Sequence, residues 1–274
     1  LAGEPLQGMV ARAKFQGSEV KVESVDVRLV AGHIVGRGTL NTSSQNFDFQ
    51  GRAESIQLAR LAALANRPGL PPITGLANFT THVAGNLKVS GLSGYNIEFN
   101  GEGKDVTING RPAGTIALNG KTENDQLNIN LTSGLLGQPQ LVSAQINLAS
   151  EYLSASVDTT LKNADLTNLF AILVPNNRVK IAGTANGTIS AKGDLLDEDH
   201  NPTSANLTGT ANFSELSFRV EDVLLTATTP LVVKFSPGEV TFEGARFTGP
   251  GTNISLDGTI ATANSGTQNL SING

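Results

Sequence analysis

Apolar and polar residues alternate through most of this chain, and that period of two limits the possible folds more than any other feature. Successive side chains of a β-strand point to opposite faces, so the alternation predicts strands with one apolar and one polar face. The parity changes between Val22 and Val25, which predicts a bulge at Glu23 and Ser24. Pro237-Gly238 predicts the turn of a hairpin. The alternating stretches are 34–40, 47–53, 97–103, 127–131, 153–157, 179–195, 231–242 and 254–260.

Two segments lack this alternation and predict short helices. Residues 55–65 carry leucine at 58, 61 and 64, with Ser55 as a possible N-cap and a break at 67–69. The second helix is expected to begin at Asn163 or Asp165 and to end at 175–177.

The two helices belong to a repeat of 108 residues. Leu58 matches Leu166 at this distance, and Asn78 matches Asn186. Such a long period predicts an array of modules, each with one helix and several strands, and we expect the chain to be a fragment of a longer protein. The predicted modules are 1–54, the back half of a preceding copy, then 55–162 and 163–274.

The composition limits the classes of function that we expect of this chain. The chain has no cysteine, three histidines and a net charge of -5, so we expect no metal site, no cofactor and no nucleic-acid partner. No catalytic motif or carboxylate pair stands out, and we expect no enzyme activity. The longest apolar run, at 169–174, is far too short for a membrane-spanning helix.

The apolar faces of the strands must be buried against something. A second sheet would make a sandwich, closure would make a barrel, and a bent sheet could hold an apolar ligand. Glycines at inward positions such as Gly36, Gly101 and Gly187, together with an aromatic content of 5%, favour the bent sheet, since small residues permit curvature and leave volume unfilled. A filled sandwich stays open as an alternative.

One order of motifs recurs in both modules. A helix with spaced leucines is followed by a break, then by apolar-x-Gly-x-Ala-Asn at 73–78 and 181–186, then by a long strand ending Gly-x-Leu. The second copy continues into Leu207-x-Gly209 and Leu256-Asp257-Gly258-Thr259-Ile260. In these motifs the chain resembles the TamB/AsmA-like family of bacterial envelope proteins over most of residues 30–262.

The resemblance implies an all-β fold: an elongated, bent antiparallel sheet that forms a hydrophobic groove. It also implies a protein of the periplasm, anchored in the inner membrane by an N-terminal helix, that carries phospholipids to the outer membrane. Some members pair with an outer-membrane barrel protein. The chain itself shows no anchor helix.

We therefore expect a non-enzymatic segment of a lipid conduit whose partners are phospholipid acyl chains. The rival hypothesis is a structural or adhesive β-solenoid or β-sandwich segment of a cell-surface protein. The residues predicted to line the groove are Ile34, Leu40, Phe47, Phe49, Ile97, Phe99, Ile181, Ile189, Leu207, Phe213, Phe235, Phe242, Ile254 and Leu256.

Overall fold

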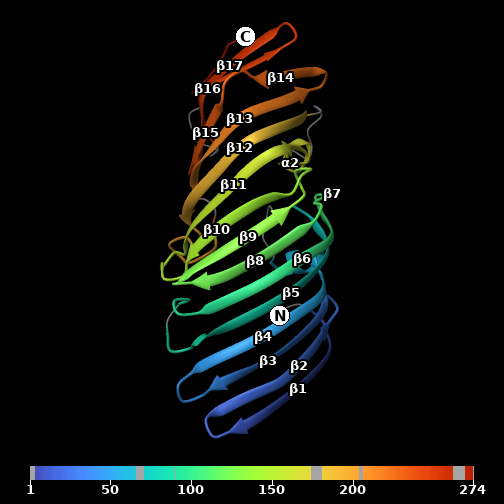
Figure 1. The fold of residues 1–274 in the computed structure, drawn as a ribbon, viewed down its shortest axis with the longest axis vertical. Coiled ribbons are helices and arrows are strands. Elements are labelled where there is room, and N and C mark those ends of the chain that lie inside the picture. The colour runs from blue at the N-terminus through green and yellow to red at the C-terminus, as the bar shows by residue number, and fades with distance from the viewer. Residues whose placement is uncertain are drawn as a thin grey trace. The chain divides into compact units, whose positions relative to one another are not determined.

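The fold is all-β, as predicted, and the residues that the structure describes form antiparallel strands and two short helices (Figure 1). The computed structural model describes residues 4–65, 71–89, 91–173, 181–203, 206–261 and 269–273. Contacts divide the chain into two compact units: unit 1 is Leu1–Ser133 with Asn147–Ala149, and unit 2 is Gly134–Ile146 with Ser150–Gly274. The predicted modules divide the chain by repeat rather than by contact, and that division stays a prediction.

In unit 1 each strand pairs with the next along the chain, from β1 to β6. Strand β6 then pairs with both β7 and β8, and β8 with β9. The strands are β1 (Leu6–Gln16), β2 (Glu19–Leu29), β3 (Gly32–Asn41), β4 (Asn46–Gln57), β5 (Ile73–Asn86), β6 (Asn96–Ile108), β7 (Arg111–Pro112), β8 (Ile116–Glu123) and β9 (Gln126–Ser133).

Unit 2 repeats this arrangement. Strands β10 to β13 pair in order, β13 pairs with both β14 and β15, and β15 to β18 again pair in order. The strands are β10 (Gln140–Asn147), β11 (Ser154–Asp165), β12 (Ile181–Asp194), β13 (Thr208–Val220), β14 (Val223–Ala227), β15 (Leu231–Ser236), β16 (Glu239–Gly249), β17 (Thr252–Ala261) and β18 (Asn269–Asn273).

The sequence repeat is visible in the strand bounds. Strands β4 and β11 begin and end 108 residues apart, and so do β5 and β12. The strand after each of these pairs, β6 or β13, bonds one short strand and one longer strand along the same edge. The repeat therefore preserves strand length and pairing as well as residue identity.

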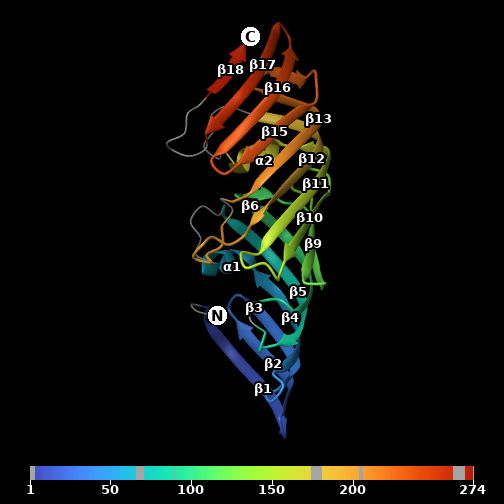
Figure 2. The same cartoon turned by 90° about the vertical axis from the view of Figure 1, so that its left-hand side faces the viewer.

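The helices lie where the alternation fails, but they start later than predicted. Helix α1 spans Leu58–Ala65 and α2 spans Thr167–Leu173. Figure 2 shows each helix on one side of the strands of its own unit. Ser55 is not an N-cap, because it lies inside β4, and Asn163 lies inside β11 in the same way. The predicted helix ends at 67–69 and 175–177 lie outside the described residues.

Ser55 and Asn163 instead form β-bulges. Both have a positive φ, 53° and 46°, and the strand register shifts at each. The amide of Ser55 donates to Asn78 Oδ1 at 2.9 Å, and that of Asn163 donates to Asn186 Oδ1 at 2.7 Å. The repeated asparagine therefore satisfies the amide that the bulge leaves without a ladder partner.

The bulge predicted at Glu23 and Ser24 is confirmed, since the register of β2 against β3 shifts between Val22 and Val25. The hairpin predicted around Pro237-Gly238 is confirmed as well, because β15 pairs with β16 across that turn.

Candidate functional site: the apolar faces of the two units

The strand register of unit 1 brings the predicted apolar residues onto one face. Residues directly opposite each other in antiparallel strands point to the same side of a sheet. Leu40 pairs with Phe47, and Phe49 pairs with Val83, which in turn pairs with Ile97. All six lining residues predicted in unit 1 lie on this face: Ile34, Leu40, Phe47, Phe49, Ile97 and Phe99.

The register of unit 2 does the same. Phe235 pairs with Gly209, and Ile254 pairs with Phe247. Leu207 is the exception among the predicted residues, because it lies one residue before β13. Those that share the apolar face are Ile181, Ile189, Phe213, Phe235, Phe242, Ile254 and Leu256.

Sequence reasoning missed several residues of these faces. The strand pairings add Met9 and Phe15 from β1, Phe79 from β5 and Ile129 from β9. Alternation is a signal for each of them, but only the register shows that they share a face with the predicted residues.

The apolar faces carry almost no charge. Arg111 of β7 pairs with Ile108 at the end of β6, and elsewhere in the described strands no Asp, Glu, Lys, Arg or His occupies a position on these faces. The hydroxyls that occur there are turned to the protein itself: Thr81 donates to Glu98 O at 3.3 Å, Thr159 to Leu141 O at 2.8 Å, and Ser133 to Ala113 O at 3.3 Å. The hydroxyl of Thr122 accepts from the amide of Ile97 at 3.2 Å. A ligand on either face thus meets hydrocarbon and satisfied hydroxyls.

Some of the glycines have a different role from the one predicted. We expected them to leave volume unfilled, but phenylalanine rings from the neighbouring strand lie across five of them, whereas Gly36 and Gly187 approach backbone atoms of the partner strand. A Cβ on Gly101 would fall 2.6 Å from Cδ1 of Phe79, its cross-strand partner. Cross-strand aromatic–glycine pairs of this kind shield the glycine backbone and pin the register. The other glycines with a partner's ring over them are Gly38 under Phe49, Gly85 under Phe47, Gly120 under Phe99 and Gly209 under Phe235.

In unit 2 part of the apolar face is covered. Leu169 and Phe170 of α2 pack against a buried cluster that contains Leu161 and Ala185. Ile189 and Phe213 pack on the same cluster, so these two predicted lining residues belong at least partly to a packed core. Ile254 and Leu256 pack on a second cluster.

In unit 1 the apolar face is only partly covered by other residues. Among the described residues, no large side chain is fully buried. Phe49 is 40% exposed, Met9 59% and Phe15 78%. A dry two-sheet core would enclose aromatic residues of this kind, so the described part of unit 1 does not form a filled sandwich.

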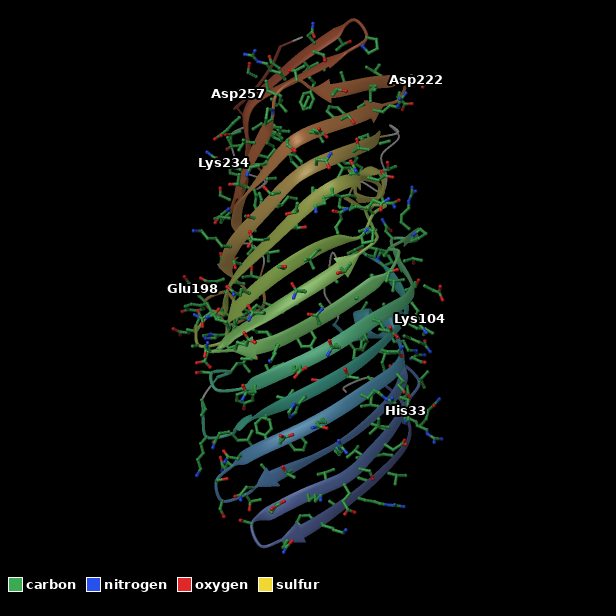
Figure 3. The ribbon with its side chains drawn as sticks, viewed as in Figure 1. His33, Lys104, Glu198, Asp222, Lys234 and Asp257 are labelled. Atoms are coloured by element: carbon green, nitrogen blue, oxygen red, sulfur yellow. The ribbon has the colours of Figure 1, made fainter. Side chains whose placement is uncertain are left out.

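Each unit has a depression on its other, polar face. One of about 480 Å³ in unit 1 is lined by residues such as Arg37, Arg52 and His82. One of about 500 Å³ in unit 2 is lined by residues such as Asp158 and Lys192. Figure 3 shows the side chains standing out from the ribbon, with the polar-face residues His33 and Lys234 labelled.

Ionisable side chains on the polar face pair with one another. His33 Nε2 lies 3.0 Å from Asp26 Oδ1, and Arg52 Nη2 lies 2.6 Å from Glu54 Oε1. The hydrogen bond from Lys14 holds the pKa of Glu23 below its ordinary value. Within the described ranges no group of three or more His, Cys, Asp and Glu side chains is placed to hold a metal ion. None of the described helices combines the length and hydropathy needed to cross a bilayer.

Comparisons with known proteins leave the family open: no family model, no curated protein and no solved structure matches the chain. The similarity to the TamB/AsmA-like family therefore depends on the motif order in the sequence.

Proposed function

We propose that the apolar faces of the two units hold lipid acyl chains. The observation that carries this proposal is the partly uncovered face of unit 1, which extends over β1 to β6, β8 and β9 without a charged residue. Removing hydrocarbon from water gains about 0.8 kcal/mol per CH2. Because the hydroxyls on the face bond within the protein, a lipid headgroup has no partner there and would stay at the edge of the sheet in water.

The wider role follows from the resemblance and is part of the proposal. The chain would be a non-enzymatic segment of a periplasmic protein that conducts phospholipids between the inner and outer membranes and supports assembly of the outer membrane. Membrane attachment by an N-terminal anchor and contact with an outer-membrane barrel protein would belong to the full-length protein.

The test is to purify the protein from bacteria without detergent, extract it with organic solvent, and identify and count the released lipids by mass spectrometry. The proposal predicts phospholipids in a defined ratio to protein. Folded protein that releases no lipid would contradict it and favour a structural or adhesive segment whose apolar faces are covered by protein. Ile189 is a poor position for a charged substitution that tests lipid binding, because the charge would also disrupt the packing under α2.

A further inference from the structure

The apolar face of unit 1 continues past the end of β4 onto a tyrosine. Tyr95 lies just before β6, and its ring meets that of Phe47 edge-on, with the ring centroids 5.4 Å apart. The ring of Phe47 in turn lies 5.8 Å from that of Phe49. Tyr95 also lies over Gly85 of β5, since a Cβ there would fall 3.3 Å from its Cγ. The three rings therefore form one apolar row from β4 to the loop that joins β5 and β6.

The hydroxyl of Tyr95 is left without a partner by the protein. The side chain is half-buried, and within the described ranges its hydroxyl makes no hydrogen bond. Tyrosine suits a boundary between apolar and aqueous surroundings, because its ring is apolar and its hydroxyl both donates and accepts hydrogen bonds. The row of rings thus ends in a polar group that is available to a ligand.

The loop around Tyr95 is held to its neighbours and still exposes apolar side chains. The amide of Leu87 donates to Gln45 O at 3.0 Å, and that of Gly94 donates to Asp125 Oδ1 at 2.7 Å. The exposed apolar side chains of the loop are Leu87, Val89 and Leu92. The apolar surface therefore reaches beyond the ends of the strands, where water is available to a headgroup.

Lys88 places a positive charge among these apolar side chains. Its Nζ donates to the backbone oxygen of Ser43 in the turn between β3 and β4, at 3.1 Å. No carboxylate of the described residues lies at ion-pair distance from it, whereas Lys14 pairs with Glu23. An ammonium group that is held in place without a carboxylate partner attracts an anionic ligand.

We infer that this end of the apolar face binds the phosphate of a phospholipid, with Lys88 and Tyr95 as hydrogen-bond donors to it. The acyl chains of the same lipid would lie over Phe47 and Phe49. The inference rests on the proposed function, because it places the headgroup of a lipid whose chains occupy the apolar face. It adds the class of lipid, one that carries a phosphate, and the direction in which the lipid lies on β4.

Two short-chain lipids with the same acyl chains test the inference on the whole protein. Dihexanoyl phosphatidylglycerol carries the phosphate, and dihexanoylglycerol lacks it. Binding would be followed by NMR titration of the β4 and β5 amides in low salt. We expect phosphatidylglycerol to bind about tenfold more tightly, the size expected of one exposed ion pair and one hydrogen bond. High salt should remove most of this preference.

Three variants locate the preference. Lys88→Gln should lose most of it while its affinity for dihexanoylglycerol stays unchanged. Tyr95→Phe keeps the ring and removes the hydroxyl, and should reduce the preference about twofold. Lys104→Gln is the matched control, because it makes the same change of charge at an exposed lysine near the other end of β6, and it should keep the full preference.

The outcomes separate this inference from the proposed function. Equal binding of both lipids by the original protein, or a preference that Lys88→Gln retains, would overturn the inference and leave acyl-chain binding in place. Binding of neither lipid would contradict the proposed function as well. Inorganic phosphate is the third probe: if it saturates the Lys88 signals as tightly as phosphatidylglycerol does, the ligand is free phosphate and the assignment to a lipid is overturned.

Discussion

A carboxylate on the uncovered apolar face should prevent lipid binding while the protein stays folded. Phe49 is the best position for this change, since it lies on β4 within the apolar face, contacts Gly38 and keeps 40% of its surface exposed. The matched control is Gln50→Asp, which places the same charge on the opposite, polar face of the same strand.

The structure sets the size of both effects. Full burial of a phenylalanine contributes about 1.5–3 kcal/mol, so loss of the partly exposed ring in Phe49→Asp should reduce the free energy of unfolding by about 1–2 kcal/mol. An ionised carboxylate covered by acyl chains loses its water at a cost of several kcal/mol. Since every 1.4 kcal/mol is tenfold in affinity, lipid binding by the Phe49→Asp variant should weaken by about 100-fold or more.

The assay pairs urea unfolding with titration of a fluorescent phospholipid analogue. Gln50→Asp should bind as the original protein does. If Phe49→Asp binds the analogue with unchanged affinity, acyl chains do not lie on this face. If Phe49→Asp fails to fold, Phe49 belongs to a closed core, and the interpretation of this face as uncovered is wrong.

Three further predictions concern the framework of the sheets. Asn186→Ala leaves a bulge amide without its acceptor and should lower the free energy of unfolding by about 1–2 kcal/mol in urea melts. Gly120→Ala forces a partner's ring off the sheet and should destabilise by about 1–3 kcal/mol, whereas Gly8→Ala, which meets open space, should not. The lowered pKa of Glu23 means that its ion pair stabilises at neutral pH and that this contribution is lost as the pH falls through that pKa; NMR titration should show a smaller shift in Lys14→Ala, where Lys21 and Arg12 remain nearby.

The face of each strand could be predicted from the sequence because alternation depends only on backbone geometry. Phe47 and Phe49 follow the period of two, and the shift at Val22 and Val25 marked a bulge because valine occupies both sides of it. The bulges of β4 and β11 were misread, since Ser55 and Asn163 are as typical of a helix N-cap as of a left-handed bulge residue. Their amides bond to asparagines 23 residues away along the chain, which no local pattern reveals.

For a similar reason, the sequence could not predict which residues pack over the apolar faces. Glycine alternating with apolar residues indicates small inward positions, but whether a ring lies over Gly101 depends on the residue opposite it, and that requires the register. The packing of Ile189 under α2 likewise joins segments that the alternation treats separately. The lining therefore divides into residues that pack on a cluster, such as Phe213, and residues that stay open, such as Phe49.

Site-specific photo-cross-linking tests most directly whether lipid lies on the apolar face. A photoreactive phenylalanine analogue would replace single residues from 47 to 52 in β4, and cross-linking to labelled phospholipid would be measured at each position. The account predicts a period of two, with strong cross-linking at 49 and 51, weaker cross-linking at 47, where Phe47 is only 9% exposed, and background at 48, 50 and 52. Uniform cross-linking, or strong cross-linking at the even positions alone, would contradict it.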